Sequence, residues 1–195
     1  MTWAARQTHV TASLAAVEVT LDADCGADAA VEQLYAAHWR RLVRLAVLLL
    51  RDQGAAEEVV QDAFIAMHGR WRSLRDPDKA LAYLRQTVVN RSRSALRHRG
   101  VVERYVARQS RAGELADPAD GPALAGDRRT AVLDALRALP TRQREVLALR
   151  YYLELSESEI ADALGISRGS VKAHASRGSA TLRELLADHL HEEDL

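Results

Sequence analysis

Apolar residues recur at intervals of three and four from Val31 onward, which is the spacing of an amphipathic α-helix. This pattern continues to Leu49 and predicts a helix that ends before a turn at Gly54. A second helix is expected from Ala55, with Trp71 near its end. The apolar residues expected to be buried by these two helices are Leu34, Leu42, Leu45, Ala46 and Leu49, then Val59, Val60, Ala63, Phe64 and Met67.

The segment Asp76-Pro77-Asp78 predicts a turn, because proline disfavours a helical residue before it and starts a helix well. A long helix is expected from Lys79, with an apolar side and a basic side. The basic side consists of Arg85, Gln86, Asn90, Arg91, Arg93, Ser94, Arg97 and Arg99. Anions are nearly absent from residues 79–102, so pairing within the helix cannot neutralise these arginines. A solvated helix face is the simpler interpretation, but the uncompensated repulsion favours contact with a polyanion.

Two aromatic residues, Trp71 and Tyr83, lie close in sequence to this basic helix. Each is consistent with two roles. It can be a core residue, or it can be a platform on which an unpaired base stacks beside the arginines. The sequence leaves both roles open.

Residues 139–177 have the pattern of a helix-turn-helix. Ser156 and Glu159 form a capping box, Gly165 can take the left-handed conformation that ends a helix, and Ser167 is placed to cap the next one. Ile166 and Val171 are the apolar residues expected to hold the two helices together. Exposed donors on the second helix suit phosphates and base edges, although such hairpins also occur as purely structural units.

Composition and charge divide the chain into segments and predict an all-α fold of two small helical domains joined by a flexible linker. We expect a flexible acidic extension over 1–28, a helical domain over 29–111, an acidic linker over 112–127 and the helix-turn-helix domain over 128–195. The net charge is zero, yet residues 31–111 contain sixteen cations and eight anions, whereas residues 128–195 contain ten cations and eleven anions. This asymmetry indicates that the first domain contacts a polyanion.

Several classes of protein are disfavoured. A single cysteine, Cys25, excludes an internal disulfide and a multi-cysteine zinc site, and it fits a reducing cytoplasm. No apolar run approaches the roughly 20 residues of a membrane-spanning helix. No phosphate-binding glycine loop or nucleophile motif is present, so we expect no enzyme, no cofactor, no metal and no small-molecule substrate.

Three motifs in this order resemble bacterial RNA polymerase sigma factors of the extracytoplasmic-function (ECF) group. They are EEVVQDAF at 57–64, YLRQTVVNR at 83–91, and the terminal helix-turn-helix with Leu139-Pro140 before it. The two upstream motifs are the specific ones, because other transcription-factor families share the helix-turn-helix. The resemblance covers about two thirds of the chain. It implies a protein that binds core RNA polymerase, directs it to promoter DNA and helps to open the duplex.

The resemblance also implies roles for particular residues. Those implied to bind polymerase are Glu57, Glu58, Gln61 and Asp62. Those implied to contact the minus-ten element are Arg75, Asp76, Lys79, Tyr83, Arg85, Asn90, Arg91, Arg93, Ser94 and Arg97. Those implied to contact the minus-thirty-five element are Arg168, Ser170, Lys172, Ala173, His174, Ser176 and Arg177. Ser179 departs from the family, in which a further arginine is common. An anti-sigma factor is a possible partner by family habit, and the sequence shows no site for it.

Two other functions are compatible with parts of the pattern. A stand-alone helix-turn-helix regulator would bind specific DNA tightly without polymerase, so a mobility-shift assay distinguishes it. A helical adaptor that binds only proteins would keep its function after Lys172 and Arg177 are changed to alanine.

Overall fold

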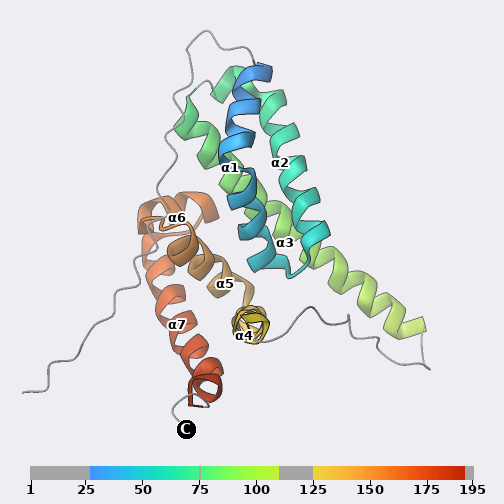
Figure 1. The fold of residues 1–195 in the computed structure, drawn as a ribbon, viewed down its shortest axis with the longest axis vertical. Helices are drawn as coiled ribbons and strands as arrows, with labels where there is room; N and C mark the ends of the chain where they lie inside the picture. The colour runs from blue at the N-terminus through green and yellow to red at the C-terminus, as the bar shows by residue number, and fades with distance from the viewer. Residues whose placement is uncertain (1–26, 75, 110–124, 192–195) are drawn as a thin grey trace, which may run out of the picture.

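The computed structural model describes residues 27–74, 76–109 and 125–191, and these residues are helical apart from short connections (Figure 1). No strand is present in these ranges, which confirms the all-α prediction. The helices are α1 (Ala27–Leu50), α2 (Gln53–Leu74), α3 (Pro77–Gln109), α4 (Ala125–Ala138), α5 (Thr141–Leu147), the π-helical η1 (Ala148–Tyr152), α6 (Glu157–Leu164) and α7 (Arg168–His191). The predicted acidic extension, apart from its last residues, and most of the predicted linker lie outside the described residues.

Helices α1, α2 and α3 form the N-terminal unit, which is a three-helix bundle from which the end of α3 projects (Figure 1). α1 begins four residues before the predicted Val31, and Ala30 in this first turn is fully buried. The predicted turn at Gly54 is wrong, because Gly54 lies inside α2. The chain instead reverses at Arg51, which has a left-handed φ of 53°. The Asp52 carboxylate then caps α2 by accepting a hydrogen bond from the Ala55 backbone N–H at 2.8 Å.

Aromatic packing stabilises the contact between α1 and α2. The rings of Tyr35 and Trp39 stack with centroids 4.6 Å apart, and Phe64 of α2 packs at 5.2 Å from Tyr35. Trp71 is buried in the same core, so its role in this structure is that of a core residue. The spacing of apolar residues was therefore a sufficient guide to which side of each helix is buried.

Helices α4 to α7 and η1 form the C-terminal unit. α5 continues directly into η1, where the Leu153 N–H donates to the Ala148 carbonyl at 3.4 Å, five residues back. Sequence periodicity did not predict this widened turn, because an apolar pattern of 3.6 residues does not distinguish it from an α-helix. Leu153 and Leu155 directly after it are both buried beneath the helix-turn-helix.

The two units pack against each other (Figure 1). Val146, Leu149 and Ile160 of the C-terminal unit belong to the same buried cluster as the core of the three-helix bundle. Leu48 of α1 packs on a smaller cluster that contains Leu136 of α4. The sequence predicted two separate helical domains, and the structure adds a shared apolar interface between them.

Candidate nucleic-acid interface

The turn of the helix-turn-helix is built by the residues that the sequence singled out. The Glu159 backbone N–H donates to the Ser156 hydroxyl at 3.3 Å, and the Glu159 carboxylate accepts from the Ser156 backbone N–H at 2.8 Å. Gly165 ends α6 with a left-handed φ of 62°. Ser167 then caps α7, because its hydroxyl accepts from the Ser170 backbone N–H at 3.1 Å. These local bonds fix the angle at which α7 leaves the turn.

Hydrogen bonding also sets the charge state of the capping carboxylate. The Ser156 hydroxyl and then the Ser156 backbone N–H lower the pKa of Glu159, with a smaller contribution from the positive charge of Arg85, while partial burial opposes them. Glu159 is therefore held as an anion at the start of α6, where the partial positive charge of a helix N-terminus favours it.

The recognition side of α7 faces outward. Val171 and Ala175 are buried against the unit, so the side chains between them project away from it. Exposed members of the predicted set are Arg168, Lys172, Ala173, Ser176 and Arg177, and half-buried members are Ser170 and His174. Lys172 lies 3.7 Å from Glu157, which in turn lies 3.8 Å from Arg150. These pairs are exposed enough for phosphate groups to compete for both cations.

The basic side of α3 has carboxylate partners that the sequence did not reveal. Within the N-terminal unit, Arg91 pairs with Asp62 at 2.5 Å and Arg99 pairs with Asp52 at 2.6 Å. The partners come from α2 and from its cap, so the expectation that pairing inside α3 cannot neutralise the arginines holds while tertiary pairing does so in part. Arg97 donates to the Ser94 hydroxyl at 3.0 Å.

Other residues predicted to contact the minus-ten element line the same helix. Asn90 is exposed and accepts from Arg93 at 3.2 Å, and Lys79 lies 3.4 Å from Asp76. The Tyr83 ring is half-buried beneath the Arg70 guanidinium, which lies 5.5 Å from its centroid. Sequence analysis missed Arg70, since it comes from the neighbouring helix. Arg75 lies outside the described residues.

The predicted polymerase-binding residues lie on the outer side of α2. Glu57, Glu58 and Gln61 are exposed, whereas Asp62 turns toward α3 to pair with Arg91. Ile65, one turn after Gln61, is an apolar side chain that remains 63 % exposed. An exposed isoleucine beside carboxylates is typical of a protein-binding surface and was not identified from the sequence.

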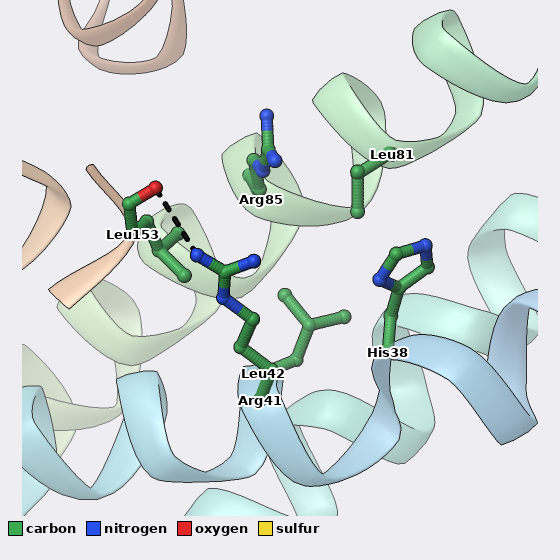
Figure 2. Close-up of a pocket in the computed structure, with 6 residues that line it drawn as sticks. All are labelled: His38, Arg41, Leu42, Leu81, Arg85 and Leu153. Atoms are coloured by element: carbon green, nitrogen blue, oxygen red, sulfur yellow. Dashed lines mark hydrogen bonds between the residues drawn. The ribbon is translucent and has the colours of Figure 1, made fainter. Parts of the chain in front are cut away.

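A small pocket lies where α1 and α3 meet the C-terminal unit (Figure 2). Its lining residues are His38, Arg41, Leu42, Leu81, Arg85 and Leu153. Arg41 donates to the Leu153 carbonyl at 3.3 Å, as the dashed line in Figure 2 shows. Burial, followed by the positive charges of Arg85 and Arg41, lowers the pKa of His38 and so favours the neutral ring. None of these residues was identified as part of a pocket from the sequence.

Two further searches limit the chemistry of the described residues. They contain no cluster of three or more histidine, cysteine or acidic side chains arranged to hold a metal ion. Within the same ranges, no helix has the length and apolar character needed to cross a membrane.

The arrangement of an acidic α2, a basic α3 and a terminal helix-turn-helix is that of the sigma-70 class of transcription proteins. Residues 34–102 match sigma-70 region 2, and residues 129–182 match sigma-70 region 4. The RNA polymerase sigma-E factor of Streptomyces coelicolor is 34 % identical over 145 residues, which span 74 % of this chain and 79 % of that protein. The sigma factor CarQ of Myxococcus xanthus is 34 % identical over 84 % of this chain and 92 % of its own length.

The ECF sigma factor SigM of Mycobacterium tuberculosis is 31 % identical over 80 % of this chain and 77 % of its own length. A solved structure of the sigma factor RpoE with the anti-sigma factor NepR from Bartonella quintana superposes with a TM-score of 0.65 at 26 % identity, covering 80 % of this chain and 96 % of that one. CnrH in complex with the cytosolic domain of CnrY gives a TM-score of 0.61 at 26 % identity, over 86 % of this chain and 99 % of that one. This chain belongs to the ECF group of RNA polymerase sigma factors.

Proposed function

We propose that this sigma factor divides promoter recognition between its two units. The α7 face that includes Lys172 and Arg177 reads the minus-thirty-five element in a major groove. The α3 face that includes Asn90 and Ser94 binds the opened strand of the minus-ten element, and Tyr83 stacks on an unpaired base. The observation that supports this most directly is the outward recognition face of α7, held by an intact capping box, in a chain that also matches region 2.

Promoter-directed transcription tests this division of roles. Purified chain is mixed with core RNA polymerase and genomic DNA, and specific transcripts are mapped. The double variant Lys172→Ala, Arg177→Ala should lose specific transcripts, because both exposed cations of the recognition face are removed. The control Arg183→Ala changes an exposed cation farther along α7 and should keep them. Equal activity of the two variants, or no promoter-dependent transcript from the native chain, would contradict the proposal.

The outer side of α2 is proposed as the polymerase-docking surface. Glu57 and Glu58 supply exposed carboxylates, and Ile65 supplies an apolar contact within the same face. The double variant Glu57→Ala, Glu58→Ala should no longer co-purify with core polymerase. Glu32→Ala, an exposed carboxylate on α1, is the matched control. Full retention of the double variant by polymerase would place the docking surface elsewhere.

The chain acts in the cytoplasm as a binding subunit, and we propose no catalytic activity of its own. Because RpoE and CnrH were solved with anti-sigma partners, an anti-sigma factor is a reasonable partner for this chain, and co-purification from native cells tests it. A stand-alone regulator is less favoured, because residues 128–195 contain ten cations against eleven anions and would bind DNA weakly without help. Tight specific binding by the isolated chain would revive that alternative.

A further inference from the structure

The interactions across the interface between the two units have a consistent polarity. Arg93 of α3 pairs with Glu145 of α5, and Arg85 of α3 lies 4.0 Å from Glu159 of α6. In addition, Arg51 pairs with Asp134 of α4, and the Arg41 guanidinium donates to the Leu153 carbonyl. In each of these interactions the cation comes from the N-terminal unit and the acceptor oxygen from the C-terminal unit. The C-terminal unit therefore presents acceptor oxygens to a cationic surface, much as a nucleic acid does.

Glu145 is the centre of this contact. Its side chain is only 2 % exposed and accepts from Arg93 Nε and Nη2, each at 2.9 Å. Arg142 of its own helix donates to the same carboxylate at 3.2 Å. A buried carboxylate is stable only when it is paired, and a two-bond arginine fork is the strongest such pairing. Glu145 thus holds the two units together and would be an uncompensated buried anion without Arg93.

The same bond withdraws Arg93 from other ligands. Its side chain is 22 % exposed, and the two nitrogens that point to Glu145 are those of the edge that binds a phosphate in two-bond geometry. Arg85, its neighbour two helical turns earlier, is similarly directed toward the C-terminal unit. An arginine engaged in this way is not available to a DNA backbone while the two units remain in contact.

We propose that the free chain is self-closed, with the C-terminal unit occupying the part of α3 that binds DNA in the open form. Glu145 stands where a DNA phosphate would bind, so the intramolecular contact and the nucleic acid compete for Arg93. Opening therefore precedes the minus-ten contact, and any partner that separates the units activates the chain. The competition rests on the proposed DNA-binding role of α3, whereas the closure itself does not.

A distance measurement tests closure without DNA or polymerase. Fluorophores are attached to cysteines placed at the exposed positions Gln33 of α1 and Glu184 of α7, in a chain whose single cysteine is changed by Cys25→Ser. Energy transfer between them reports the separation of the units. The variant Glu145→Gln keeps the shape of the side chain and removes its charge, and it should lower the transfer efficiency. Asp162→Asn, an exposed carboxylate of α6, is the control and should not.

Binding of an oligothymidine strand, a polyanion without promoter sequence, tests the competition. Glu145→Gln should bind it about tenfold more tightly than the native chain, which is equivalent to about 1.4 kcal/mol. Asp134→Asn disrupts a more exposed pair of the same interface and should shift both readouts in the same direction by less. It also serves where Glu145→Gln loses helical circular dichroism.

The outcomes separate the two parts of the proposal. Lower transfer efficiency with tighter binding supports it. Transfer efficiency equal to that of Asp162→Asn in both interface variants overturns closure. Lower transfer efficiency with unchanged binding overturns the competition, since the uncovered part of α3 would then not be a DNA surface. Promoter-directed transcription by the native chain is measured separately, so failure of the proposed function is distinguished from failure of closure.

Discussion

The capping box before α6 offers a sharp test of how the helix-turn-helix is held together. Ser156→Ala removes the hydroxyl that accepts from the Glu159 backbone N–H at 3.3 Å and donates to its carboxylate at 2.7 Å. Loss of such a cap costs about 1 kcal/mol, within a range of about 0.5–2. With a urea dependence of roughly 2 kcal/mol per molar, the midpoint of unfolding should fall by about 0.5 M.

The acid side of the profile gives an independent check. The pKa of Glu159 is lowered in the folded chain from an ordinary value of 4.5, chiefly by Ser156, so its stabilisation is present above that value and is lost as pH falls through the folded pKa. In Ser156→Ala the pKa of Glu159 moves back toward its ordinary value. The stability difference between native and variant chains should therefore be largest near neutral pH and shrink below about pH 4.5.

The measurement is urea unfolding followed by far-ultraviolet circular dichroism at neutral and acidic pH. Ser158→Ala is the matched control, because Ser158 is an exposed serine in the first turn of the same helix. Such a surface change should stay within about 0.5 kcal/mol of the native chain. Equal midpoints for the two variants, or a difference that does not change with pH, would refute the assigned role of the cap.

The remaining predictions concern packing, titration and DNA binding. Gly178→Ala should lower stability by about 1 kcal/mol, because the added Cβ would lie 3.1 Å from side-chain atoms of α5, whereas Gly169→Ala in the same helix should raise stability by about 0.5 kcal/mol; thermal unfolding of both variants checks this. Leu149→Ala, at a fully buried position, should cost about 2–5 kcal/mol in urea unfolding, and a loss below 1 kcal/mol would contradict the shared core. Burial and two nearby arginines lower the pKa of His38, so the native chain should lose stability as pH falls below 6.5 and His38→Gln should lose less, as measured by urea midpoints across that range. Lys172→Ala should reduce the slope of log affinity against log salt for a minus-thirty-five duplex by about 1, and an unchanged slope would show that this cation does not contact phosphate.

Local features of the fold were predictable because their causes lie within a few residues of one another. The capping box at Ser156 and the left-handed Gly165 depend on bonds that span three or four positions, so the order of residues alone identifies them. The buried sides of α1 and α2 follow from the spacing of apolar residues for the same reason. The turn before α2 was misplaced, because glycine signals a turn in general while here the Asp52 cap and the φ of Arg51 form it.

The candidate site was predictable as a set of faces but not as a set of interactions. The basic side of α3 and the exposed donors of α7 follow from helical periodicity, and residue type gives their chemistry. The partners of the arginines do not follow, because Arg91 meets Asp62 across 29 positions and Arg93 meets Glu145 across 52. No pattern within a helix encodes which carboxylate on another helix will approach it.

By itself, the sequence determined that the described chain is helical, where its helix-turn-helix begins and turns, and which helix faces are cationic. Each of these depends on hydrogen bonds and side-chain spacing within one or two helical turns. Only the tertiary structure decided that the two units share an apolar core, that Trp71 is a core residue, and that Glu145 is buried against Arg93. These outcomes depend on how helices distant in sequence pack, since packing sets both the desolvation of a charge and the nearest opposite charge.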